Sequence, residues 1–176
     1  SAVAPKGYRE QALQPGLRWI IPYFENVVRY PISKQSYTMS IAPVEGQVQG
    51  DDSVAARTSD GQEIFMDASI IYAIDPQQVV NVHIAWQDRY TNEFVRPLTR
   101  GIIRDAVSQY GVQAVYSSKR NELTQDITDA LRTKLSQNGL VLSEFVLRTI
   151  TFSPAYAASV EHKQIAEQQP QQATVE

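Results

Sequence analysis

The chain has 176 residues, of which 43% are apolar, and a formal net charge of −3. This length suits one domain or two small ones, and the apolar share excludes wholesale disorder. The acidic balance argues against a nucleic-acid-binding protein, which normally carries a strong basic excess. Because the chain has no cysteine, disulfides and cysteine-ligated zinc are excluded.

The first 16 residues contain two prolines and two glycines and predict a loop and a turn. They lead into the most apolar short run, Leu17–Phe24, which is far shorter than the roughly 20 residues that span a bilayer. Two interpretations stay open: a buried strand that Pro22 ends, or an interfacial segment, because Trp and Tyr favour the headgroup zone. The candidate membrane-proximal side chains are Leu17, Trp19, Ile20, Ile21, Tyr23 and Phe24.

Three strands are expected in the first half of the chain. Residues 26–41 alternate as a long strand, in which Pro31 marks an edge or a bend. Residues 53–58 form a short strand, and Asp60-Gly61 predicts a hairpin with a type I′ turn because both residues tolerate positive φ. The clearest strand follows, with apolar residues at a period of two. They are Ile64, Met66, Ala68, Ile70, Tyr72 and Ile74.

Helices are expected to follow. Asp75-Pro76 caps and opens a short one. A longer helix covers residues 86–110, and Pro97 should kink or divide it. A third begins at Ser118 and ends at Asn138-Gly139, which supplies a left-handed C-cap. Its apolar face is formed by Leu123, Ile127, Leu131 and Leu135.

The most informative feature is the join between the last strand and an exit helix. The β-type run Leu140–Phe152 stops at Ser153-Pro154, which launches a polar helix over residues 155–169. Serine suits the N-cap because its hydroxyl accepts a free backbone N–H, and proline suits the first helical position because its missing N–H would be unpaired there. The last strand therefore feeds a helix that leaves the domain.

This order of elements predicts an α+β fold: an antiparallel or mixed sheet with helices packed on one face, followed by an exit helix. We expect one domain over residues 1–154, with a division into two subdomains near residue 75 left open. The exit helix over 155–169 starts an oligomerisation segment, and residues 170–176 form a flexible tail.

Little in the sequence predicts catalysis or metal binding. His83 and His162 are the only histidines and are far apart, and we expect His83 to be structural or merely exposed. No nucleophile elbow, P-loop or dinucleotide-binding fingerprint is present. The acidic pair Asp51-Asp52 is interpreted as solvated loop charge. We therefore expect no enzyme, no metal and no cofactor; a hydrolase with a dispersed site is the enzymatic alternative.

Five stretches in this order resemble the SPFH or band 7 family, which includes prohibitins, stomatins and flotillins. They are Gln14–Pro22 with its glycine, apolar run and proline, the hairpin Ala56–Glu63, the strand end Tyr72–Pro76, the last strand Leu140–Phe152, and the exit helix Val160–Gln168. The likeness covers about residues 7–169. The prohibitin branch is the most similar, from the helix that contains Arg96-Pro97-Leu98-Thr99-Arg100.

The resemblance implies a membrane-associated scaffold without catalytic residues. Members of the family are usually anchored by an N-terminal membrane segment, which is absent from this chain, and assemble through this domain and a coiled coil into rings or cages. They organise membrane microdomains and often regulate membrane proteases. The implied partners are membrane lipid, further copies in the full-length protein and a membrane protease, and no nucleic acid is expected. The implied oligomerisation residues are Ala157, Val160, Gln164 and Ile165.

One departure and one alternative qualify this expectation. Pro170 interrupts the exit helix, and a proline in a helix interior costs about 3 kcal/mol or more, so a coiled coil cannot run smoothly through it. The alternative function is a soluble adaptor module that docks a membrane protein or protease without contacting lipid.

Overall fold

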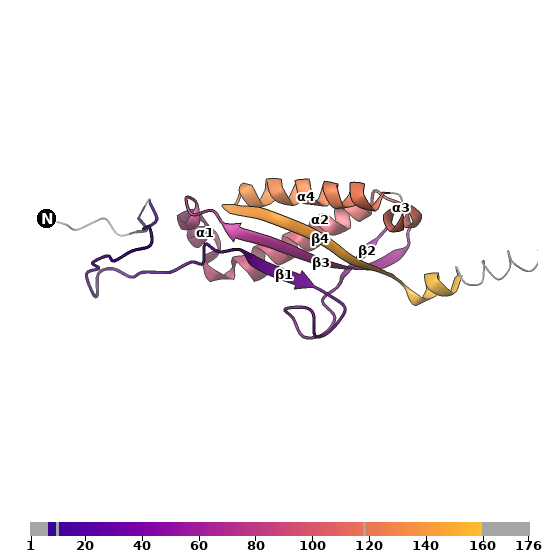
Figure 1. Ribbon diagram of the computed structural model, residues 1–176, viewed down its shortest axis with the longest axis horizontal. Helices are drawn as coiled ribbons and strands as arrows, with labels where there is room; N and C mark the ends of the chain where they lie inside the picture. Colours follow the sequence, from indigo (N-terminus) through magenta and orange to yellow (C-terminus); the bar gives the residue numbers. More distant parts are fainter. Residues whose placement is uncertain (1–6, 10, 118, 160–176) are drawn as a thin grey trace, which may run out of the picture.

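The computed structural model describes residues 7–9, 11–117 and 119–159, and within them the fold is the expected α+β fold. An antiparallel sheet is built around one long central strand, and helices lie against one of its faces (Figure 1). Its strands are β1 (Gln35–Met39), β2 (Val54–Arg57), β3 (Glu63–Ile74) and β4 (Leu140–Phe152).

The central strand β3 pairs with β4 along one edge and with both β1 and β2 along the other. β2 pairs with residues 63–66 of β3, and β1 pairs with residues 68–72. Asp67 lies at the gap between them, where its carboxylate accepts hydrogen bonds from the Ser40 hydroxyl (3.0 Å) and the Ile41 N–H (2.9 Å). The buried Asp67 thus satisfies the backbone where the chain leaves β1.

The period-two pattern of β3 predicted its core face correctly. All six side chains of that pattern are at most 1% exposed, and Tyr37 and Met39 of β1 join them in the core. The strand expected over residues 26–41 is confined to Gln35–Met39. Gln35 pairs with Tyr72, two residues before β3 ends, so the residues upstream of Gln35 have almost no strand left to pair with.

The hairpin between β2 and β3 is present, but its turn is not of type I′. A type I′ turn needs positive φ at both central residues, whereas in this loop only Gly61 has one (+82°). The Gly61 N–H donates to the Thr58 carbonyl (2.9 Å), and the Thr58 N–H donates to the Gln62 carbonyl (2.9 Å). This pattern is typical of a longer loop with a glycine bulge.

The described helical segments between β3 and β4 come in a single run. They are α1 (Val79–Trp86), the 3₁₀ turn η1 (Gln87–Arg89), the π turn η2 (Thr91–Val95), α2 (Arg96–Val107), α3 (Val112–Tyr116) and α4 (Arg120–Ser136). The α1 helix begins at Val79, three residues after Pro76, because Asp75 instead caps a turn: its side chain accepts from the Gln77 N–H (2.9 Å).

Pro97 divides the long helix that was expected over residues 86–110. It lies in the first turn of α2, and the π turn η2 immediately precedes it. A proline has no N–H to donate back along the helix, which suits a position where one helix ends and another begins. In α2 the buried residues are Thr99, Ile103 and Val107, which form the face that packs on the core.

Helix α4 and its end follow the sequence pattern closely. Its four leucine and isoleucine positions are fully buried, and Gly139 adopts the left-handed conformation (φ +77°) that the C-cap needs. The helix begins at Arg120, near the expected Ser118. The chain then enters β4, which returns antiparallel to β3.

Candidate functional site

The apolar run near the start of the chain projects from the domain body. It is neither a strand nor buried, so the buried-strand interpretation is wrong. The side chains of Leu17, Trp19, Tyr23 and Phe24 are nearly or fully exposed, with Trp19 at 96%, while Ile20 and Ile21 are about half exposed. Figure 1 shows this segment extending beyond α1, away from the sheet.

A tight turn presents these side chains. The backbone N–H groups of Phe24 and Glu25 donate to the Ile21 carbonyl (3.2 and 3.0 Å), and Tyr23 takes a positive φ of 71°. Glu25 braces the turn, because one carboxylate oxygen accepts from the Ile21 N–H (2.9 Å) and the other pairs with Arg9 (2.5 Å). The Ile21 amide and the Arg9 guanidinium together lower the pKa of Glu25.

The segment is fastened to the domain at a histidine. The ring of Tyr8 meets His83 of α1 edge-on (centroids 4.9 Å apart), and the Tyr30 hydroxyl lies 2.6 Å from His83 Nδ1. Tyr30 also contacts Tyr90, and burial raises the pKa of Tyr30. Both ends of the 8–30 segment therefore converge on one side chain, and we call this segment the N-terminal loop. His83, expected to be structural or merely exposed, is half-buried against these two tyrosines.

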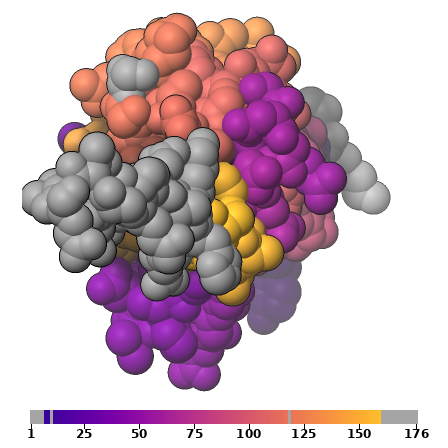
Figure 2. All heavy atoms as spheres, turned by 90° about the vertical axis from the view of Figure 1, so that its right-hand side faces the viewer, coloured from indigo at the N-terminus to yellow at the C-terminus, as the bar shows by residue number. Residues whose placement is uncertain are grey.

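The exit helix begins as predicted. The Ser153 hydroxyl accepts from the Tyr156 N–H (3.3 Å), and the residues from Pro154 to 159 are helical. Phe152 packs at a tilt against both Tyr116 of α3 and Tyr156 of the exit helix (5.4 and 5.1 Å between centroids), which holds the first turn on the domain. Figure 2 shows the start of the exit helix, in yellow, against the body of the domain.

Only part of the proposed oligomerisation face can be located. Ala157 is exposed on the first turns of the exit helix. The other three positions lie outside the described residues: Val160, Gln164 and Ile165.

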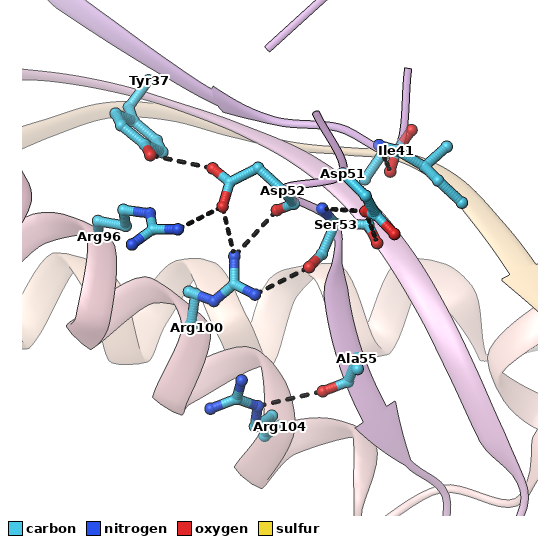
Figure 3. A network of polar contacts seen from close by, with 10 residues as sticks. Tyr37, Ile41, Asp51, Asp52, Ser53, Ala55, Arg96, Arg100 and Arg104 are labelled. Atoms are coloured by element: carbon cyan, nitrogen blue, oxygen red, sulfur yellow. Dashed lines mark hydrogen bonds and ion pairs between the residues drawn. The ribbon is translucent and has the colours of Figure 1, made fainter. Parts of the chain in front are cut away.

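A buried carboxylate links the loop before β2 to helix α2 (Figure 3). Asp52 is 3% exposed; one oxygen accepts from the Tyr37 hydroxyl (3.0 Å), and the other meets Arg96 (2.5 Å) and Arg100 (3.0 Å). The interpretation of Asp52 as solvated charge is therefore wrong, because two arginines 44 and 48 residues away neutralise it. The neighbouring Asp51 is exposed, as expected.

The arginines of α2 also satisfy the outer edge of β2. Arg100 donates to the carbonyls of Asp52 and Ser53 (both 2.9 Å), and Arg104 donates to the carbonyl of Ala55 (3.1 Å). Spacing of four residues places Arg96, Arg100 and Arg104 on one helix face, as Figure 3 shows. One carbonyl of the edge strand β2, that of Ala55, is thereby occupied by a side chain.

The electrostatics of this cluster follow from burial and pairing. Burial, and then the bond to Asp52, raise the pKa of Tyr37 to about 12. The hydrogen bond to Asp52 raises the pKa of Arg96, whereas burial lowers that of Arg100. The buried Asp52 carboxylate, bonded to Tyr37, Arg96 and Arg100, joins the sheet to helix α2.

Neither a metal cluster nor a membrane-spanning helix occurs in the described part of the chain. Its histidine, aspartate and glutamate side chains form no group of three that could hold a metal ion. No helix there is both long and apolar enough to cross a bilayer. The N-terminal loop, with its exposed apolar turn, is the candidate functional site.

The fold is an α+β domain with an exposed apolar loop, and comparison with known proteins gives its family. The model of the SPFH domain / Band 7 family matches residues 3–176, and the chain belongs to this family. The predicted resemblance is confirmed.

Prohibitins are among its relatives. The chain is 20% identical over 167 residues to "Mitochondrial prohibitin complex protein 1" of Caenorhabditis elegans, covering 95% of this chain and 56% of that protein. It is 21% identical to Prohibitin-1 of Saccharomyces cerevisiae (95% and 53% covered) and 20% identical to Prohibitin-2 of Schizosaccharomyces pombe (96% and 54% covered). The chain spans about half the length of these relatives.

Proposed function

We propose that this chain is a non-catalytic scaffold domain whose N-terminal loop contacts a membrane. In the full-length protein it would oligomerise to organise membrane microdomains and regulate a membrane protease. The observation that carries the membrane contact is the exposed apolar turn with Leu17, Trp19, Tyr23 and Phe24 at its surface. Membership of the SPFH family supports the scaffold role.

Exposing these four apolar side chains to water costs free energy, and burying them in a bilayer recovers it. Fully burying one large apolar side chain is worth about 1.5–3 kcal/mol, so four exposed together represent a large unused driving force. A contiguous exposed apolar patch marks a protein or membrane interaction site. Trp19 and Tyr23 favour a membrane, because these residues are enriched at the headgroup level.

The arrangement of the two functional ends supports a scaffold. The N-terminal loop and the start of the exit helix lie at opposite ends of the sheet (Figure 1). The rigid docking of Tyr156 on Phe152 gives the exit helix a defined departure from the domain. A domain of this kind can hold lipid at one end and direct an assembly helix from the other.

Vesicle flotation tests the membrane contact. We expect the Trp19→Asp, Phe24→Asp double variant to lose at least about tenfold in binding, since each change removes more than the 1.4 kcal/mol that corresponds to a factor of ten. The matched control is Val44→Asp, which places the same charge at an apolar side chain that is 93% exposed in a different loop.

Two outcomes would contradict this proposal. Equal vesicle binding by the double variant and the wild type would remove the N-terminal loop as the contact. Capture of a membrane protein from detergent extract, with no flotation of the wild type, would favour the lipid-independent adaptor. Unchanged circular dichroism shows that the variant folds.

A further inference from the structure

A groove beside the apolar turn contains two arginines. Its volume is about 540 Å³, and none of the described residues that line it is acidic. The lining residues are Arg9, Gln11, Ala12, Leu13, Gln14 and Arg18. The groove thus offers two guanidinium groups and two side-chain amides, all hydrogen-bond donors, next to an apolar wall.

The groove and the apolar turn form one unit. Arg9 on the groove wall is paired with Glu25, and the same carboxylate holds the Ile21 N–H of the turn. Arg18 stands directly between Leu17 and Trp19, is exposed, and has no ion-pair partner among the described residues. When Trp19 enters a bilayer, the adjacent Arg18 therefore lies at the level of the polar headgroups.

Charge is distributed unevenly along the chain. The first 34 residues contain five basic and two acidic side chains, a net charge of +3, whereas the remaining 142 contain 11 basic and 17 acidic, a net charge of −6. The N-terminal loop itself, residues 8–30, has three basic and two acidic side chains, a net charge of +1 in an acidic protein. An anionic surface attracts this end of the chain and repels the rest, which orients the domain.

We propose that the groove with Arg9 and Arg18 binds the phosphate of anionic phospholipids while the apolar turn enters the interface. This inference rests on the proposed membrane contact and adds the lipid class. A guanidinium matches phosphate with two parallel N–H donors, and each arginine near an anionic leaflet contributes to attraction that salt screens. The apolar wall beside the groove suits the glycerol and upper acyl region of the same lipid.

The test compares phosphatidylcholine vesicles with vesicles that also contain phosphatidylglycerol. We expect the wild type to bind the anionic vesicles more tightly and to lose that gain at high salt. Arg18→Gln should lose about fivefold on the anionic vesicles and keep its binding to phosphatidylcholine. The control is Arg57→Gln, which makes the same charge change at an exposed arginine of β2.

The outcomes separate this inference from the proposed function. Equal binding of the wild type to both vesicle types, or equal losses in the two variants, would overturn the lipid class and leave the membrane contact standing. Failure to bind either vesicle would overturn the membrane contact itself. Inorganic phosphate that displaces the protein more than chloride at matched ionic strength would assign the groove to free phosphate and overturn the lipid assignment.

Discussion

The buried carboxylate of Asp52 connects the sheet to helix α2. It lies between Tyr37 of β1 and the arginines of α2, so three elements depend on one side chain. The same arginines belong to the Arg96–Arg100 stretch that carries the prohibitin resemblance. Here they are structural: they neutralise a charge and cover the carbonyls beside β2.

Removing that charge should destabilise the fold. We expect Asp52→Asn to lower the free energy of unfolding by about 2–4 kcal/mol, because it leaves two partly buried arginines without a counter-ion. Urea denaturation measures the loss. Asp51→Asn is the control: it changes the adjacent exposed carboxylate, whose partner is Ser53, and should cost under about 1 kcal/mol. Equal losses would show that Asp52 is not the link.

The raised pKa of Tyr37 predicts that the fold loses stability at alkaline pH. Its pKa is about 12 in the folded protein and about 10 when unfolded, so its neutral form stabilises the fold fully below pH 10. This contribution is lost as the pH rises toward 12. At pH 11 the free energy of unfolding has fallen by about 1 kcal/mol. Between pH 9 and pH 11 the wild type should lose more stability than Tyr37→Phe; parallel curves would contradict the assignment.

Single elements were predictable where their pattern is local. The core face of β3, the apolar face of α4 and the Ser153 cap all follow from residues within a few positions of one another. The length of β1 was not predictable, because it depends on where its partner strand ends. The arginine partners of Asp52 were hidden for the same reason, since they lie 44 and 48 residues away.

Two glycines should respond oppositely to alanine. Gly139 after α4 has φ +77°, and an added Cβ would lie 2.9 Å from Gln78 Cβ and from Val82 Cγ2. Gly101 inside α2 has open space around it. Gly139→Ala should destabilise by more than about 1 kcal/mol, and Gly101→Ala should stabilise by about 0.5–1 kcal/mol. Thermal melts measure both, and a stable Gly139→Ala protein would contradict the described C-cap.

At the scale of the molecule, the N-terminal loop extends from the domain and is attached to it at both ends through contacts with His83. The sequence identified its apolar run and left two interpretations open. The structure removes the buried strand and adds the fastening of Tyr8 and Tyr30 to His83, a contact that no local pattern could reveal. The SPFH domain / Band 7 family model matches the chain over both this loop and the exit helix.

The most direct measurement follows Trp19 itself into the bilayer. The chain has two tryptophans, and Trp86→Phe leaves Trp19 alone; the change is mild, because Trp86 is stacked on Phe94 and its ring N–H has no hydrogen-bond partner. With vesicles of brominated phospholipid, we expect the Trp19 emission to shift to the blue and to be quenched. An unshifted and unquenched emission from vesicle-bound protein would contradict the membrane contact of the N-terminal loop.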